Sequence, residues 1–108
     1  MALGEFEQLV LLAVLHLKDE AYGVSIVDAI EARTERSVSR SSLYVTFDRL
    51  EDKGFLTSEL RPGDETRGGR FRRYVRVTSR GLDALQESRR TLMGMWDGLE
   101  PLLEGADS

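Results

Sequence analysis

The stretch SRSSLYVTFDRLEDKGFL, residues Ser39–Leu56, has the pattern of a complete helix with both of its ends. Leu43, Phe47 and Leu50 recur at intervals of four and three, which predicts that they share one buried helix face. The serine that opens the stretch can act as an N-cap, because its hydroxyl can accept an orphan backbone N–H. Gly54 follows a lysine and is typical of the residue just after a helix.

Two alternating segments after this helix predict a β-hairpin. Leu56–Leu60 alternates apolar and polar residues, and Arg61–Asp64, with the sequence RPGD, is typical of a turn. Arg72–Val77 is a second alternating segment, with its two valines on one face and its tyrosine on the other. A long loop that contains glycine would join the two strands.

Apolar spacing predicts three further helices. Gly4–Leu17 is apolar on most sides, which indicates burial on most sides, in part by a second subunit. Ala21–Arg33 is the second helix. Thr78 can cap a final helix with a heptad-like apolar seam, which Pro101 should end or bend near Leu99. The positions of this seam are Leu82, Leu85, Leu92, Trp96, Leu99 and Leu103.

The order of elements is therefore helix, helix, helix, hairpin, helix. We interpret this as a mainly α fold with a small two-stranded β-hairpin, a winged helix-turn-helix followed by a C-terminal dimerisation helix. Residues 1–78 would form the DNA-binding domain, and residues 79–108 the dimerisation helix and tail. The third helix would be the one presented to DNA.

The charge of the chain is unevenly distributed. Its 108 residues have a net charge of −4. Arg36–Arg80 holds eleven Lys/Arg and six Asp/Glu, a net +5, while the rest holds four and thirteen, a net −9. A basic middle flanked by acidic ends indicates a local anionic partner.

Composition also bounds the class of protein. There is no cysteine, which excludes disulfides and thiolate metal sites. The N-terminus lacks the basic region of a signal peptide, and the apolar run Leu9–Leu15 is too short to span a membrane. We expect a soluble, cytoplasmic protein.

If Leu43, Phe47 and Leu50 face the core, the opposite side of the third helix carries polar and small residues. Recognition helices contact bases mainly with their N-terminal part, and here Arg40–Thr46 contains no acid. Arg40 suits a guanine or a phosphate, and Val45 a thymine methyl. The alternatives are a polar face that only meets water and, for Tyr44, a partly buried aromatic ring. The DNA-binding candidates on this helix are Arg40, Ser41, Ser42, Tyr44, Val45 and Arg49.

The segment TRGGRFRRYVR, residues Thr66–Arg76, holds five arginines and no acid. It fits a wing whose tip arginines enter a narrow, electronegative minor groove. A disordered RNA-binding tail and a solvated loop without a partner are the alternatives. Arg67 and Arg70 are best placed at the tip, whereas Arg72 and Arg76 share a strand face with the tyrosine. The wing candidates are Arg67, Gly69, Arg70, Arg72 and Arg73.

Together, SRSSLYVTFDRLEDKGFL and GGRFRRYVRVTSRG resemble the PadR-like winged-helix transcriptional regulators. The N-terminal helix and the Tyr22-Gly23 pair after it extend the resemblance to roughly residues 4–85. It implies a homodimeric repressor that binds an inverted-repeat operator through Ser41–Tyr44 and the wing arginines. The chain departs from the family where Val45 replaces a proline of some members, and where Arg40 and Ser41 replace a frequent Pro-Gly.

The resemblance also implies dimerisation through a single final helix, and many members respond to small aromatic or planar compounds. Plain dimer packing is one interpretation of the seam around Trp96, and an effector cavity beside two Trp96 rings is the other. The candidates for this dimer or effector surface are Leu92, Met93, Trp96 and Leu99.

Two other functions compete with this interpretation. The sequence, with its one histidine, offers no nucleophile–base pair, no phosphate-binding glycine loop and no metal motif, so we expect neither an enzyme nor a cofactor. A winged-helix module that binds proteins without specific DNA binding is the second rival. The arginine-rich wing argues against it.

Overall fold

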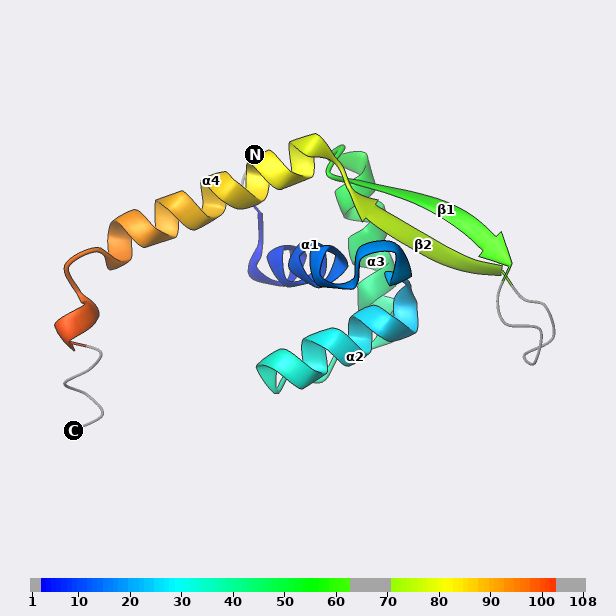
Figure 1. The fold of residues 1–108 in the computed structure, drawn as a ribbon, viewed down its shortest axis with the longest axis horizontal. Coiled ribbons are helices and arrows are strands. Elements are labelled where there is room, and N and C mark those ends of the chain that lie inside the picture. Colours follow the sequence, from blue (N-terminus) through cyan, green and yellow to red (C-terminus); the bar gives the residue numbers. More distant parts are fainter. Residues whose placement is uncertain (1–2, 63–70, 103–108) are drawn as a thin grey trace.

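In the computed structural model, which describes residues 3–62 and 71–102, three helices and the base of a hairpin form a body from which a fourth helix projects (Figure 1). The hairpin extends from the body on the side opposite to the far end of this helix (Figure 1). The mainly α fold with a two-stranded antiparallel hairpin is confirmed. The elements are α1 (Glu5–Leu17), the 3-10 turn η1 (Lys18–Glu20), α2 (Gly23–Thr34), α3 (Arg40–Asp52), β1 (Leu56–Pro62), β2 (Phe71–Val77) and α4 (Ser79–Trp96).

Local capping signals set the ends of α3 and the start of α4. The Ser39 hydroxyl accepts the backbone N–H of Ser42 at 3.2 Å, as expected of an N-cap. Gly54 follows α3 with a φ of +79°, which favours glycine. The Thr78 hydroxyl accepts the N–H of Gly81 at 3.0 Å and begins α4. These predicted boundaries are confirmed.

Other boundaries differ from the prediction. α2 begins at Gly23 rather than Ala21, because the chain first makes the 3-10 turn η1. Arg61 and Pro62, predicted to lie in a turn, are the last residues of β1 and pair with Arg72 and Phe71. A proline is tolerated there because its strand has only one neighbour, and the missing N–H takes no bond from a central ladder.

The core joins the three short helices, the hairpin base and the beginning of α4. Leu43, Phe47 and Leu50 of α3 are fully buried, as their spacing predicted. Val75 from β2 and Leu85 from α4 belong to the same cluster. The first turns of α4 thus pack against the residues before it, and the domain division at residues 78 and 79 stays a prediction.

The connection between β2 and α4, which we call the joint, lies close against the backbone of Gly54 and Phe55. The Thr78 hydroxyl donates to the Gly54 carbonyl at 2.7 Å, and the Thr78 N–H donates to the Phe55 carbonyl at 3.0 Å. A Cβ at Gly81 would overlap that Phe55 oxygen and lie 2.9 Å from Cγ1 of Val77. Only glycine therefore lets α4 start where it does.

A buried ion pair connects the first helix to the end of the third. Lys53 Nζ lies 2.8 and 2.9 Å from the two carboxylate oxygens of Glu7, which also accepts the Gly4 N–H at 2.8 Å. Burial raises the pKa of Glu7, but the bond from Lys53, the Gly4 N–H and the charges of Lys53 and Arg49 outweigh it, so the net pKa is lowered. Glu7 and Lys53 are separated by 46 residues in the sequence, so no local sequence pattern predicts this ion pair.

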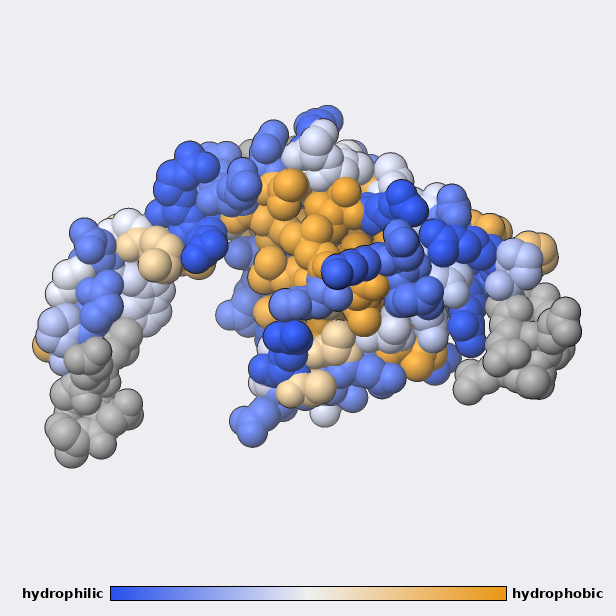
Figure 2. All heavy atoms as spheres, viewed as in Figure 1, coloured by the Kyte–Doolittle hydropathy of each residue, from blue (hydrophilic) through white to orange (hydrophobic). Residues whose placement is uncertain are grey.

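Apolar side chains remain exposed on α1 and along α4. Leu12 and Leu15 of α1 are exposed in the single subunit, where the sequence predicted that a second subunit supplies part of the burial. Figure 2 shows apolar side chains gathered over α1, beneath the root of α4. A second subunit is one way to cover this surface. No helix in the described part of the chain has the length and apolarity needed to cross a membrane.

α4 ends close to the predicted position. The helix ends at Trp96, three residues before Leu99, and Gly98 follows with a φ of +87°. The Asp97 N–H still bonds the Met93 carbonyl at 2.9 Å. Leu103, the last predicted seam position, lies outside the described residues.

Candidate nucleic-acid interface

The first half of α3 presents an exposed face without acid. The predicted candidates Arg40, Ser41, Ser42, Tyr44 and Val45 of this half are all exposed, as is Arg49 in the second half, while Leu43, Thr46 and Phe47 between them are buried. The first carboxylate of the helix is Asp48. Backbone N–H groups and the positive end of the helix dipole lie at the same end. This face therefore suits an anionic partner.

Serine hydroxyls gather at the beginning of α3. Ser39 Oγ donates to Ser42 Oγ at 2.8 Å, and Ser41 Oγ lies 3.4 Å from Ser39 Oγ. The Ser42 carbonyl accepts the buried Thr46 hydroxyl at 2.8 Å. The capping bonds fix these side chains at the exposed end of the helix, where hydroxyls can donate to phosphate or base edges.

Tyr44 is both packed and exposed, so its ring is partly buried, while its role in DNA binding stays a prediction. Its ring meets Phe47 edge-on at 5.7 Å between centroids, and 39% of its surface is accessible. A Cβ on Gly23 would lie 2.6 Å from the Tyr44 hydroxyl oxygen. Gly23 thus lets the start of α2 pack directly against Tyr44. Val45, beside it, is 55% exposed.

The outer face of the hairpin forms a stack of aromatic and arginine side chains. The Tyr22 and Tyr74 rings lie 5.2 Å apart between centroids. Arg61 lies over Tyr74 at 4.2 Å and Arg72 over Tyr22 at 4.5 Å. The Val75 N–H donates to the Ala21 carbonyl at 2.9 Å, which attaches β2 to the segment that carries Tyr22. Arg72 thus lies on the face predicted for it.

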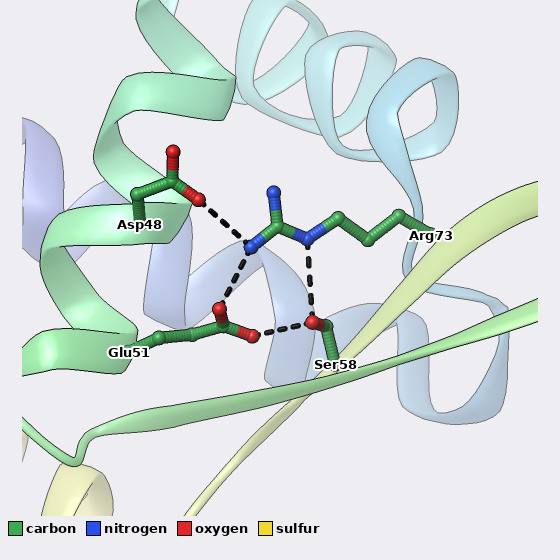
Figure 3. Close-up of polar contacts among 4 residues, drawn as sticks. All are labelled: Asp48, Glu51, Ser58 and Arg73. Atoms are coloured by element: carbon green, nitrogen blue, oxygen red, sulfur yellow. Dashed lines mark hydrogen bonds and ion pairs between the residues drawn. The ribbon is translucent and has the colours of Figure 1, made fainter.

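Arg73 points to the other face of the hairpin and reaches α3 (Figure 3). Its Nη2 lies 3.0 Å from Asp48 Oδ1 and 2.8 Å from Glu51 Oε2. Its Nε donates to Ser58 Oγ at 3.3 Å, and the Ser58 hydroxyl donates to Glu51. We refer to these four residues as the Arg73 cluster.

The structure places only part of the predicted wing site. Arg67, Gly69 and Arg70 lie outside the described residues. Arg72 and Arg73 contact the aromatic ring and the carboxylates just described. No pairing for Arg73 was predicted, although strand alternation puts it on the same face as Val75 and Val77.

The predicted dimer or effector surface is exposed in the single subunit. Leu92, Met93, Trp96 and Leu99 are all exposed, and Trp96 is 45% accessible. A cavity of about 310 Å³ between α1 and α4 is lined in part by Leu3, Ala84 and Leu92, but not by Trp96. The described residues contain no group of three side chains able to hold a metal ion.

Comparison with known proteins gives consistent results. Residues 11–87 match the model of the family described as transcriptional regulator PadR-like. The transcriptional regulator Rv3488 of Mycobacterium tuberculosis is 40% identical over 83 residues, which cover 75% of this chain and 73% of that protein.

Solved structures show the same fold. The PadR family transcriptional regulator from Eggerthella lenta is 33% identical, with a TM-score of 0.68 over 93% of this chain and 87% of that one. The PadR-like transcriptional regulator from Bacillus cereus, at 20% identity, has a TM-score of 0.70 over 91% and 90% of the two chains. The latter likeness concerns the fold alone.

Proposed function

Because this chain belongs to the PadR-like family of transcriptional regulators, we propose that it is a homodimeric repressor that binds an inverted-repeat operator. Its relatives and its fold are those of DNA-binding regulators, which are not enzymes. The observation that carries the proposal is the exposed, acid-free first half of α3, with Arg40, Tyr44 and Val45 on its surface. We propose the cytoplasm as the place of action.

Two subunits would place two such helices in successive major grooves. The exposed apolar side chains of α1 and α4 supply the surface that pairs the subunits. Two-fold symmetry then matches the inverted repeat, with half-sites about 34 Å apart. The wing arginines at positions 67 and 70 would contact the adjacent minor groove or phosphates.

DNA binding should depend steeply on salt. Several phosphate contacts per dimer predict a log–log slope of affinity against salt of about −0.9 per contacted phosphate. Arg40→Ala should lower operator affinity by about 1–3 kcal/mol, or reduce the salt slope by about one per subunit if Arg40 contacts a phosphate. Fluorescence anisotropy with the promoter DNA beside the gene measures both quantities.

Arg90→Ala is the matched control for this experiment, because Arg90 is exposed on α4 and its removal changes the net charge equally. A shallow salt slope, or equal affinity for every duplex, would support instead a winged-helix module that binds proteins.

We further propose that a small planar or aromatic compound releases the repressor by binding next to Trp96. The exposed indole and its neighbours Met93 and Leu92 provide an adaptable apolar surface for such a compound. Trp96 is the only tryptophan, so its fluorescence reports binding directly. An unchanged emission with a broad panel of planar compounds contradicts the effector and leaves plain dimer packing.

A further inference from the structure

We propose that Arg73 is a positioning residue that fixes the wing against the recognition helix α3 and neutralises the carboxylates there, instead of binding DNA itself. The inference rests on the proposed function for its consequence in DNA binding. The geometry of the Arg73 cluster carries it independently.

The cluster joins both strands of the wing to one helix. Arg73 comes from β2 and Ser58 from β1, while Asp48 and Glu51 stand one turn apart on α3 (Figure 3). One guanidinium nitrogen bridges the two carboxylates, and Glu51 holds the Ser58 hydroxyl with its other oxygen. Charge-assisted bonds of this kind are stronger than neutral ones and are directional.

The Arg73 side chain also packs against the core. Its guanidinium carbon lies 5.4 Å above the centre of the Phe47 ring, and Phe47 is a fully buried core residue. Only 24% of the Arg73 side chain is exposed. The Arg73 guanidinium stacks on a core ring and bonds to three protein oxygens. Its binding capacity is therefore used within the protein and not by DNA.

The position of Arg73 marks where the wing leaves the body. On the same face of β2, Val75 is buried, while Phe71, nearer the tip, is 65% exposed. Arg73 lies between Val75 and Phe71, where the packed base of the hairpin meets the part that projects from the body. The contacts of this side chain therefore help to set the angle at which the projecting part of the hairpin leaves α3, together with the bond from Val75 to Ala21 and the stack on the other face.

Neutralisation is the second part of the role. Asp48 is exposed and Glu51 partly exposed on the helix that would enter the major groove. Free carboxylates near phosphates repel them, and the repulsion is weaker when a guanidinium lies within 3.0 Å. Arg73 thus contributes to DNA binding through the acids it pairs.

Removal of Glu51 separates this proposal from direct DNA binding by Arg73. If Arg73 bound a phosphate, loss of Glu51 would free the Arg73 guanidinium for that contact and would remove a negative charge. The affinity for DNA would then rise. If Arg73 positions the wing, affinity falls although the protein becomes more positive. The two hypotheses therefore differ in the sign of the effect.

The test compares Glu51→Met, Arg73→Met and the control Asp52→Asn in operator titrations over a range of salt. Asp52 also lies on the last turn of α3, and no ion pair in the described part of the chain involves it. We expect Glu51→Met and Arg73→Met to weaken binding about tenfold, the equivalent of about one charge-assisted hydrogen bond. Their salt slopes should stay at the parent value, because no phosphate contact is lost. Asp52→Asn should bind as well as the parent or better.

Hydrogen exchange of the backbone amides of β2 tests the positioning without DNA. We expect exchange at residues 71–75 to be faster in Glu51→Met and unchanged in Asp52→Asn. Unchanged exchange in Glu51→Met, or a rise in its operator affinity with a flatter salt slope for Arg73→Met, overturns the proposal. If the parent protein binds no operator, the proposed function fails, while the exchange result still decides whether Arg73 positions the wing.

Discussion

Gly81→Ala is expected to lower the free energy of unfolding by about 2–4 kcal/mol, a large effect for a single methyl group. The new Cβ would overlap the Phe55 carbonyl oxygen and crowd Val77. α4 would have to withdraw, which strains the bonds that Thr78 makes to Gly54 and Phe55. Urea denaturation followed by circular dichroism measures the loss.

Gly94→Ala adds the same methyl group to the same helix and is the matched control. A Cβ at Gly94 has no neighbour within 4 Å in the subunit. Alanine is more favourable than glycine inside a helix by about 0.5–1 kcal/mol, so this variant should be as stable as the parent or more so. Similar losses in both variants would contradict the close joint at Gly81.

Leu92→Asp combined with Trp96→Asp is expected to convert the proposed dimer to a monomer. Both side chains are exposed on the α4 seam, and two buried carboxylates without partners would oppose association. A monomer engages one half-site at a time, so affinity for the inverted repeat should fall by about 10²–10⁴-fold. Sedimentation velocity and operator titration measure the two effects.

Gln86→Asp with Gly94→Asp provides the control. These positions add two charges to the same helix but lie away from the seam by the 3.6-residue repeat. The control should remain a dimer and bind the operator with at most a small electrostatic loss. A parent protein that sediments as a monomer while bound tightly to the repeat would contradict the proposed homodimer.

The parts of the fold that were predicted correctly are those set by neighbours in the sequence. The period of Leu43, Phe47 and Leu50 and the hydroxyls of Ser39 and Thr78 act within one or two turns, so the bounds of α3 and the start of α4 followed from them. The 3-10 turn before α2 and the extension of β1 through Pro62 depend on tertiary contacts and pairing, which local propensity does not contain.

The candidate site divides in the same way. Exposure of Arg40 through Val45, apart from Leu43, follows from knowing which face of α3 is buried. The partners of Arg73 do not follow, because Asp48 and Glu51 are 25 and 22 residues away. A long flexible side chain can reach several carboxylates, and only the three-dimensional arrangement selects among them. The DNA-binding roles of all these residues stay predictions.

The close joint at Thr78 and Gly81 has a mechanical consequence. α4 spans 18 residues, and at a rise of about 1.5 Å per residue it is a rigid arm about 27 Å long. A rotation of about 5° at its root displaces the Trp96 end by about 2 Å relative to the wing, more than half of the 3.4 Å rise of one base pair. In a dimer whose pairing includes the far ends of two such arms, the stiffness of this joint would contribute to how closely the spacing of the two wings matches the helical repeat of DNA.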